Sequence, residues 1–236
     1  MVTAAPLPTL YYTESSPTGP DAPTSADSPL HAEALRLKDG RLYTGACVDG
    51  VPHGVGTALY PSGNKYEGMW TRGAESGRGK TSQAGMSYEG DMSGGKGEGP
   101  AVIIDDVGTR YEGDTSNFAP HGVGVMLWSD GSMYTGEWVH GNMEGVGALR
   151  RNSQLVHEGA YVHGRRHGKG RSFDAEGALY VGMWHSNKKQ GKGRETDTDG
   201  TVFRGRWFNN LRHGRASMRS REGVVTTGVW VRGVRL

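Results

Sequence analysis

The sequence predicts an all-β protein in which β-hairpins pair side by side to form one elongated, twisted, antiparallel sheet, a single-layer array of the solenoid type. Three observations predict this fold. A short motif recurs along most of the chain every 23 residues, and once after 22. Glycine accounts for 40 of the 236 residues and keeps fixed places in that motif. Leu, Ile, Val and Phe together number 38, which is too few for the core of a conventional two-layer domain.

Residues 1–33, before the repeats, have a different composition. Six of the ten prolines lie between Pro6 and Pro29, among Ser, Thr and Ala. The segment has no Lys or Arg, and its charges are those of Glu14, Asp21, Asp27 and Glu33. Because so little apolar surface cannot offset the entropy of ordering the chain, we predict a disordered, acidic Pro/Ser/Thr-rich tail. Its Ser and Thr residues leave open a role as a phosphorylated or docking segment, although no specific motif marks one.

The repeats define the units of residues 34–236. We place a half-unit at 34–42, a closing half-unit at 226–236, and full units that start at residues 43, 66, 88, 111, 134, 157, 180 and 203. A unit usually opens with an aromatic residue, and it has glycine in third place and most often tryptophan in fifth place. The glycines are Gly45, Gly68, Gly90, Gly113, Gly136, Gly159, Gly182, Gly205 and Gly228. The tryptophans are Trp70, Trp138, Trp184, Trp207 and Trp230.

Each unit is interpreted as a β-hairpin. Places one, three and five share one face of the first strand because side chains alternate along a strand. A turn of about five residues, such as 139–143, leads to a second strand that begins with Gly-x-Gly, and an Asp-Gly turn leads to the next hairpin. Since glycine weakens a strand, its place between two aromatic residues predicts that a ring from a neighbouring strand lies over the bare backbone.

The motif Tyr-Glu-Gly-x-Trp, followed by His-Gly-x-Gly and a turn glycine, resembles the MORN (membrane occupation and recognition nexus) repeat over residues 34–236. The resemblance implies recognition and scaffolding, as in cytoskeletal and flagellar assemblies and membrane junctions. MORN repeats also stand beside the catalytic domain of some phosphatidylinositol phosphate kinases, for which these 236 residues leave no room. Departures from the pattern predict local irregularity in the middle of the sheet: Thr115 for the aromatic residue, Pro100-Ala101 and Ala216 in Gly-x-Gly, and Gln154 for the turn glycine.

Both ends of the array are expected to be sheet edges. Residues 34–42 resemble a second strand with a turn at Asp39-Gly40, and residues 226–231 resemble a lone first strand. An exposed edge strand can pair with another chain. The residues of the C-terminal edge are apolar and prone to form strands: Thr226, Thr227, Val229, Trp230 and Val231. We therefore predict end-to-end self-association, such as a homodimer, which the MORN resemblance also implies.

Charge is unevenly distributed, because residues 34–149 carry a net charge of −5 and residues 150–236 a net charge of +11. The candidate binding residues are six arginines of the eighth unit: Arg204, Arg206, Arg212, Arg215, Arg219 and Arg221. They could contact anionic lipid headgroups or an acidic protein such as tubulin. A solvated face that keeps the sheet soluble is the simpler interpretation. No matching domain motif is present, which argues against a nucleic-acid partner.

Residues that resemble catalytic motifs fall within the repeats. Ala74–Thr81 satisfies a relaxed phosphate-loop pattern, but such a loop needs a buried strand before it and a helix after it. Glu89/Asp91 and Glu112/Asp114 have the spacing of paired carboxylates, although an open sheet offers no dry cleft for them. Four of the nine histidines hold one repeat place, at His53, His121, His167 and His213. We predict no catalytic residue, metal site or cofactor. A single cysteine, Cys47, and the lack of a long apolar segment predict a cytoplasmic protein.

Two functions from different classes compete. The preferred hypothesis is a non-enzymatic scaffold or adaptor whose concave aromatic-glycine face holds an extended or helical segment of a partner protein, in a cytoskeletal or flagellar assembly. The alternative is a peripheral membrane protein that binds anionic phospholipids through the basic C-terminal face. A third hypothesis, an accessory role in phosphoinositide metabolism, rests on the family resemblance alone.

Overall fold

The computed structural model describes residues 34–83 and 85–236, and the regular elements of this part of the chain are all β-strands. The tail predicted for residues 1–33 lies outside the described residues. The strands are β1 (Leu35–Arg36), β2 (Leu42–Val48), β3 (Val51–Leu59), β4 (Lys65–Thr71), β5 (Ala74–Gln83), β6 (Met86–Ser93), β7 (Lys96–Ile104), β8 (Arg110–Ser116), β9 (Ala119–Leu127), β10 (Ser132–Val139), β11 (Asn142–Arg151), β12 (Gln154–Val162), β13 (Arg165–Phe173), β14 (Leu179–His185), β15 (Lys188–Thr196), β16 (Val202–Phe208), β17 (Leu211–Arg219), β18 (Val225–Val231) and β19 (Val234–Arg235).

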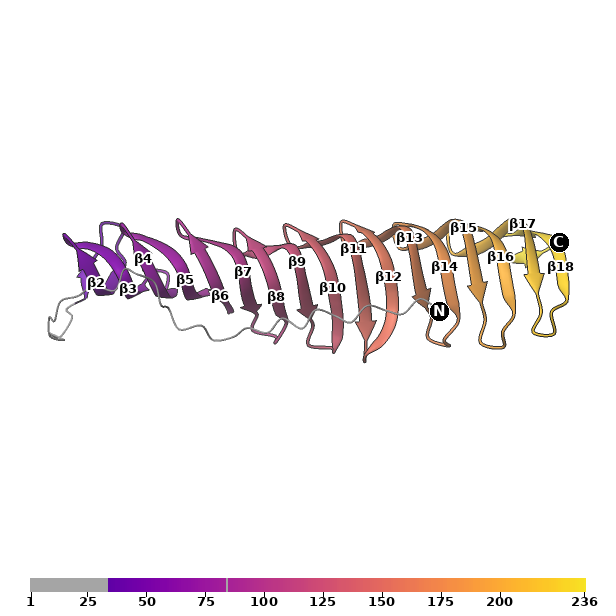
Figure 1. The fold of residues 1–236 in the computed structure, drawn as a ribbon, viewed down its shortest axis with the longest axis horizontal. Coiled ribbons are helices and arrows are strands. Elements are labelled where there is room, and N and C mark those ends of the chain that lie inside the picture. The colour runs from indigo at the N-terminus through magenta and orange to yellow at the C-terminus, as the bar shows by residue number, and fades with distance from the viewer. Residues whose placement is uncertain (1–33, 84) are drawn as a thin grey trace, which may run out of the picture. The chain divides into compact units, whose positions relative to one another are not determined.

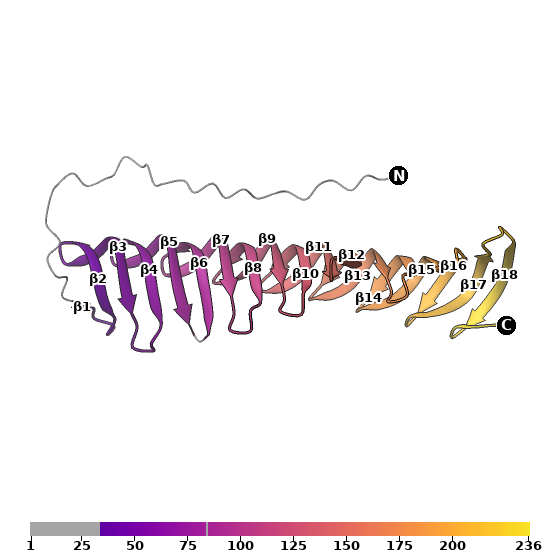
Figure 2. The same ribbon diagram turned by 90° about the horizontal axis from the view of Figure 1, so that it is seen from below.

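The strands form one antiparallel sheet in which each strand pairs with the strand before it and the strand after it in the sequence. Figure 1 shows the hairpins following one another along the sheet, and Figure 2 shows the strong twist of the strands. No second layer covers the sheet in the part of the chain that the structure describes. The predicted fold class is therefore confirmed. The described residues contain no helix that could cross a membrane.

The turn inside each hairpin is shorter than the sequence predicts. In the unit that starts at residue 134, Val139 pairs with Asn142, so the turn is only His140-Gly141. Both turn residues have positive φ angles, +46° and +78°, which is the geometry of a type I′ turn and matches the twist of the strands. The expected five-residue loop is wrong because the residues beyond the turn continue the strand ladder.

A β-bulge follows each of these turns and accounts for the Gly-x-Gly motif. In the hairpin β4–β5, Trp70 pairs with Glu75 and Gly68 pairs with Gly79, so that Met69 alone faces residues 76–78. The first glycine of the motif in this unit, Gly77, has a φ of +59°, which a residue with a side chain adopts only at a cost. The motif therefore marks a bulge, and its second glycine faces the third-place glycine of the first strand.

The connections between units are mostly four-residue turns closed by glycine. In the turn after β9, the Gly131 amide donates to the Trp128 carbonyl at 3.0 Å, and the Trp128 amide donates to the Ser132 carbonyl at 2.9 Å. The unit with Gln154 in the glycine place differs. There the hairpin β11–β12 closes with a two-residue turn, Asn152-Ser153, in which both φ angles are positive. The departure at Gln154 thus changes one turn without interrupting the sheet.

Most facing glycine pairs make room for a tyrosine ring, and the pair of Gly159 and Gly170 makes room for the His157 ring. A Cβ atom added at Gly147 would lie 2.2 Å from the Tyr134 hydroxyl oxygen, and one added at Gly136 would lie 2.5 Å from the Cα of Gly147. The ring that covers Gly147 comes from the neighbouring strand, β10. The ring beside Gly136 is that of Tyr134 on the same strand, which corrects the expectation that a neighbouring strand supplies it. One ring therefore fills the space above two glycines.

The tyrosine hydroxyl bridges the bulge. The Tyr66 hydroxyl donates to the Met69 carbonyl at 2.9 Å, and five other first-place tyrosines donate to the carbonyl three residues ahead. The Tyr111 hydroxyl also lies 3.3 Å from the His121 carbonyl of the bulged strand. Burial raises the pKa of the Tyr66 phenol to about 12, so the hydroxyl keeps the proton that it donates. This hydrogen bond fixes each ring over its glycines.

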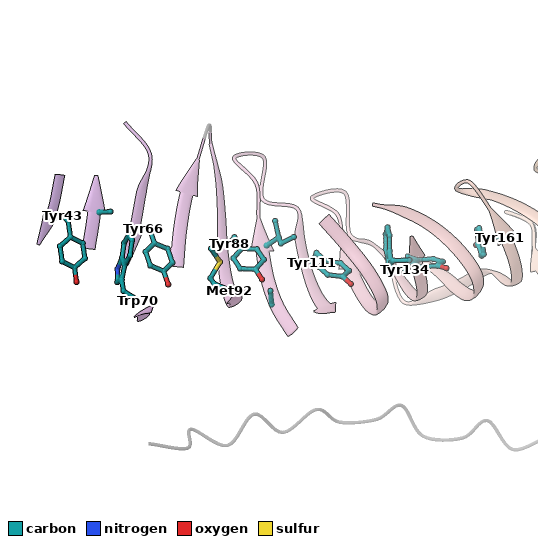
Figure 3. Packing of buried hydrophobic residues seen from close by; sticks show 12 residues of the cluster. Tyr43, Tyr66, Trp70, Tyr88, Met92, Tyr111, Tyr134 and Tyr161 are labelled. Atoms are coloured by element: carbon teal, nitrogen blue, oxygen red, sulfur yellow. The ribbon is translucent and has the colours of Figure 1, made fainter. Parts of the chain in front are cut away.

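Edge-to-face contacts join the rings of successive units into a ladder. Tyr134 meets Trp138 of its own unit at 5.1 Å between ring centroids and Tyr161 of the next unit at 5.2 Å. The contacts continue through His157, Trp184, Tyr180, Trp207 and Phe203 to Trp230. Figure 3 shows the tyrosines from Tyr43 to Tyr161 in succession along the sheet. Such pairs stabilise a fold by about 0.5–1.5 kcal/mol each beyond the area they bury.

In the irregular middle units, other side-chain contacts replace the missing contacts between rings, and the sheet continues. Met92 and Thr115 take the fifth place in the two middle units that lack an aromatic residue there, and both are buried. The Thr115 hydroxyl lies 3.1 Å from the Tyr88 hydroxyl and donates to the Gly99 carbonyl at 2.8 Å. Phe118, from the next turn, meets Tyr88 edge-on at 5.1 Å. The strand ladder is continuous here, while the ring ladder is replaced by these contacts.

Replacing Gly136 with valine tests the ring-over-glycine packing. We expect Gly136→Val to reduce the free energy of unfolding by at least about 2 kcal/mol, because its side chain would occupy the space of the Gly147 backbone and the Tyr134 ring. Because each unit contacts only its neighbours, the units around β10 should unfold together. The measurement is the melting temperature, which we expect to fall by roughly 5 °C or more.

The matched control is Gly141→Asn, in the turn of the same hairpin. A Cβ atom at Gly141 meets nothing within 4 Å, and asparagine already occupies the same turn place at Asn187 and Asn210 with a φ of +69°. We expect the melting temperature of this variant to stay within about 2 °C of the wild type. A Gly136→Val chain that melts like the control would show that the ring does not occupy this space.

Candidate functional site

The face that carries the aromatic ladder, called here the aromatic face, presents few of its rings to a partner. The first-place and fifth-place rings are almost completely buried, at 0–5% exposure from Tyr43 to Trp230. The sequence hypothesis of an aromatic-glycine surface that holds a partner therefore needs a correction. The rings and glycines form the core, and a partner on this face would touch those side chains over the rings that stay partly exposed, which begin at Pro120.

Those covering side chains come from one place in the second strand of each hairpin. This place pairs across the hairpin with the fifth-place residue, as Arg166 pairs with Tyr161 and Met143 pairs with Trp138. Its nine occupants, called here the covering row, are Pro52, Glu75, Gly97, Pro120, Met143, Arg166, Lys189, Arg212 and Arg235. The row contains no cation before β13 and only cations from β13 onward.

The four cations of the covering row, called here the cation row (Arg166, Lys189, Arg212 and Arg235), lie over ring faces. The Arg166 guanidinium lies 4.2 Å from the centre of the Trp184 ring, and Lys189 Nζ lies 4.8 Å from the centres of the Tyr180 and Trp207 rings. Arg212 covers Phe203 at 4.7 Å, and Arg235 covers Trp230 at 5.5 Å. Cations are attracted to the negative face of an aromatic ring, so the ladder holds each charge in place.

One buried carboxylate balances the middle of the cation row. Glu195 accepts from Lys189 at 2.5 Å and from Arg212 at 2.7 Å, and Arg212 also lies 3.5 Å from Asp197. At the two ends the arrangement differs. Within residues 34–83 and 85–236, no carboxylate lies at ion-pair distance from Arg166 or Arg235. The row as a whole therefore keeps a positive charge.

The six arginines chosen from the sequence do not form one surface. Arg204, Arg206, Arg215 and Arg219 are exposed on the face opposite the rings, because Arg204 pairs with Ser217 and Arg219 pairs with Val225 in the same alternation. Arg212 lies on the aromatic face, opposite Trp207. Arg221 follows the end of β17 and lies in a turn. Four of the six candidate arginines therefore lie on one face, and the binding role of the six stays a prediction.

Further cations complete this cluster on the opposite face. Arg206 pairs with Lys192 and Arg204 pairs with Arg194, and Lys192, Arg194, Arg206 and Arg215 line one depression. In the described part of the chain, none of these side chains has a carboxylate at ion-pair distance. Further toward the N-terminus the same face carries carboxylates beside its cations, since Glu89 lies 3.9 Å from Lys80 and Glu112 lies 2.6 Å from Arg110.

The C-terminal edge strand is partly covered. β19 pairs with the last residues of β18, matching Trp230 with Arg235 and Val231 with Val234. The Leu236 amide donates to the Val229 carbonyl at 2.9 Å, and the Arg235 guanidinium donates to the Thr227 carbonyl at 2.9 Å. The expectation that residues 226–231 form a lone edge strand is therefore wrong, because the segment after them supplies partners. Self-association through this edge stays a prediction.

The sequence motifs that resemble catalytic sites take ordinary places in the sheet. Ala74–Thr81 lies within β5, and the next element is another strand, so no helix N-terminus faces it. Glu89 and Asp91 are exposed on the strand surface, where Glu89 lies 3.9 Å from Lys80. The structure gives these residues no enclosed site. In residues 34–83 and 85–236, no group of three His, Cys, Asp or Glu side chains is placed to hold a metal ion.

Sequence reasoning missed three members of the cation row, namely Arg166, Lys189 and Arg235. The signal was present, because these residues and Arg212 recur every 23 residues. Side-chain alternation along a single strand does not assign this place to the aromatic face. Across a hairpin the bulge adds residues to one strand, so the partner of the fifth-place residue is known only from the register.

His157 occupies a first place that is usually tyrosine, and it leaves polar atoms without partners. The ring is fully buried between Tyr161 and Trp184. Both ring nitrogens of His157, the Tyr161 hydroxyl and the Trp184 indole nitrogen lack hydrogen-bond partners. Burial, with a smaller effect of the Arg166 charge, lowers the pKa of His157 to about 4. This unit is therefore less well satisfied than its neighbours.

The geometry defines a class of protein, an open β-hairpin repeat protein whose core consists of the first-place and fifth-place rings and the glycines beneath them. The MORN repeat family matches residues 43–65, 66–83, 111–133, 134–154, 157–177, 180–202 and 203–225. The chain belongs to the MORN repeat family. The matched ranges leave out the unit that starts at residue 88, where Met92 and Ala101 replace the usual tryptophan and glycine. None of the curated proteins matches the sequence.

Several solved structures are similar at low identity. The TCP10 domain of Danio rerio CPAP, in complex with a peptide of Danio rerio STIL, is 13% identical with a TM-score of 0.44, over 82% of this chain and 96% of that chain. The same domain alone is 13% identical with a TM-score of 0.41, over 83% and 93%. The SAS-4 TCP domain of Drosophila melanogaster, in complex with a proline-rich motif of Ana2, is 11% identical with a TM-score of 0.32, over 89% and 96%.

Restoring the repeat tyrosine at residue 157 tests the account of the unsatisfied unit. We expect His157→Tyr to raise the free energy of unfolding by about 1 kcal/mol at pH 7.5, because a tyrosine hydroxyl would reach the Ala160 carbonyl. The wild type should also lose stability as the pH falls from about 6.5 to 4. The pKa of His157 is about 4 in the folded chain, so the unfolded chain takes up the proton first.

Thermal unfolding at several pH values measures both effects. The stability lost by the wild type through His157 should be of the order of 2–3 kcal/mol and should be absent from the variant. Burial raises the pKa of Glu75 to about 7, which acts in the opposite direction between pH 7 and 4.5, so the difference between the two chains is the quantity to compare. His163→Tyr, at an exposed histidine, is the control. Equal pH profiles for wild type and His157→Tyr would contradict the account.

Proposed function

We propose that this MORN repeat protein is a non-enzymatic scaffold that binds a partner protein along its aromatic face. The observation that carries the proposal is the part of the covering row from Pro120 to Arg235, in which one side chain per hairpin stays at least partly exposed on the aromatic face at a constant interval. A row of this kind matches an elongated partner that repeats contacts along its length. The rings hold the covering side chains in place, and the buried rings themselves do not contact the partner.

Ordering of the site before binding supports the same function. Lys189 and Arg212 are held by the rings and by Glu195, and their side chains are only 19% and 25% exposed. Side chains that are already fixed lose little entropy when a partner binds, which favours affinity. Further along the face Pro120 and Met143, both partly buried, continue the row with apolar groups. The face thus joins an apolar part and a cationic part in one line.

We place this scaffold in the cytoplasm, in a cytoskeletal or flagellar assembly, with the basic C-terminal half against an acidic structural protein. The charge asymmetry of the two halves supports this assignment, because one end of the sheet would attract an acidic filament surface and the other would not. The family membership supports it as well.

Site-specific photo-crosslinking in cells tests the function. A photoreactive amino acid at Met143, in the covering row, should give covalent adducts with a discrete partner, and the tagged chain should remain in the detergent-insoluble cytoskeletal fraction. The matched control is the same amino acid at Val146, which is 61% exposed on the opposite face. Adducts from position 146 and none from position 143 would show that the partner binds elsewhere.

A second function, binding of anionic phospholipids, is favoured by the cluster on the opposite face. Lys192, Arg194, Arg206 and Arg215 lie together without carboxylates among the described residues. Each cation near an anionic membrane surface contributes about 1 kcal/mol, and salt weakens the interaction.

Liposome flotation tests the second function. If the cluster binds lipid, phosphatidylserine vesicles should carry the wild-type chain at low salt and release it at high salt, and Arg206→Glu with Arg219→Glu should abolish flotation. Lys96→Glu with Lys188→Glu, at exposed hairpin tips, changes the net charge equally and should leave flotation intact. A wild-type chain that never floats at low salt removes this function.

A further inference from the structure

We infer that the cation row of Arg166, Lys189, Arg212 and Arg235 binds an acidic segment of the partner protein, whose carboxylates recur at the spacing of the hairpins. The inference rests on the proposed function and names the chemistry of the partner. It concerns the aromatic face and is separate from the arginine cluster on the opposite face.

The first support is that the residue type in the covering row changes along the sheet, although its structural position in each hairpin is the same. Tryptophan is the fifth-place partner of Glu75 and Met143 as well as of three members of the cation row, so a residue that pairs with this ring does not have to be a cation. Proline, glycine and methionine fill this place in most of the hairpins before β13, which shows that the fold has no need of a cation there. Four consecutive cations from β13 to β19 are therefore an addition that the repeat does not require.

The second support is the uncompensated charge. Arg166 and Arg235, at the two ends of the row, have no carboxylate at ion-pair distance in the described residues, while Glu195 is shared by Lys189 and Arg212. Arg166 is held by the Asn187 carbonyl at 3.2 Å and by the Trp184 ring. Its burial lowers the pKa of the guanidinium, which shows the cost of a desolvated cation. An incoming carboxylate would offset that cost.

The spacing of the row gives the geometry of the segment. Neighbouring cations are two strands apart, about 9.6 Å at the usual strand separation of about 4.8 Å. An α-helix places residues i and i+7 on one face about 10.5 Å apart. A polyproline II segment places every third residue on one face about 9.3 Å apart. Both can align one carboxylate with each cation. The twist of the sheet decides which follows the row more closely.

Binding of synthetic acidic peptides to the full chain tests the inference. The probes are a helical peptide with Glu at i, i+7, i+14 and i+21, and a proline-rich peptide with Glu at every third residue. For each, one control has Gln in place of Glu and a second has the same composition with irregular Glu spacing. We expect one spaced peptide to bind about tenfold more tightly than both of its controls, with an affinity that falls as salt rises.

Two sets of variants assign the binding to the row. Arg166→Gln with Arg235→Gln should weaken binding by about five- to tenfold, and circular dichroism verifies that the sheet is intact. Met143→Arg extends the row by one hairpin, so it should bind a peptide with five Glu residues about threefold more tightly than the wild type does. The matched control Val146→Arg adds the same charge on the opposite face and should leave peptide affinity unchanged.

Three results would overturn the inference. The Gln or irregular peptides could bind as tightly as the spaced ones, Met143→Arg could gain no more than Val146→Arg, or the row variants could lose binding to phosphatidylserine vesicles while no peptide binds. If crosslinking at position 143 still captures a partner in any of these cases, the scaffold function stands and only the acidic nature of the segment is refuted. If position 143 captures no partner, the proposed function fails as well.

Discussion

The structure depends on one packing arrangement, in which a tyrosine ring lies over two facing glycines and its hydroxyl reaches the carbonyl three residues ahead on its own strand. The ring takes the volume of two absent Cβ atoms, so a side chain at either glycine would displace it. The β-bulge brings the carbonyl groups within reach of the hydroxyl. Together with the ladder contacts between units, this arrangement buries the aromatic residues of a single-layer sheet. No second layer is needed to cover them.

The departures from the repeat follow from the same arrangement. In the unit that starts at Phe203 the ring has no hydroxyl, and Ala216 takes the place of the second glycine. The atom nearest to a Cβ at the equivalent glycine, Gly147, is a tyrosine hydroxyl oxygen, so its loss makes room for a methyl group. His157 shows the opposite case, in which a shorter polar ring fills the place and its nitrogens are left without partners.

Recognition and stability are divided between different residues in this molecule. The rings and glycines are fixed by packing, whereas the covering row above them varies from proline to arginine with the pairing register unchanged. A repeat of this kind can change what it binds without changing its core, because the covering side chain varies between hairpins while the rings beneath it stay packed. The cationic half of the row is one result of that freedom, and the apolar half is another.

The sequence by itself determined the period, the hairpins and the buried face, because alternation along a strand and the restrictions on glycine are local properties. It also led to the MORN repeat family. Only the tertiary structure decided the two-residue turns, the bulges, the covering row and the capping of β18 by Arg235 and Leu236. These features depend on the pairing between strands. Each bulge adds residues to one strand of a hairpin, so side-chain alternation within one strand does not give the register across the hairpin. For that reason Arg212 lies over Phe203, while Arg215, three residues later, lies on the opposite face.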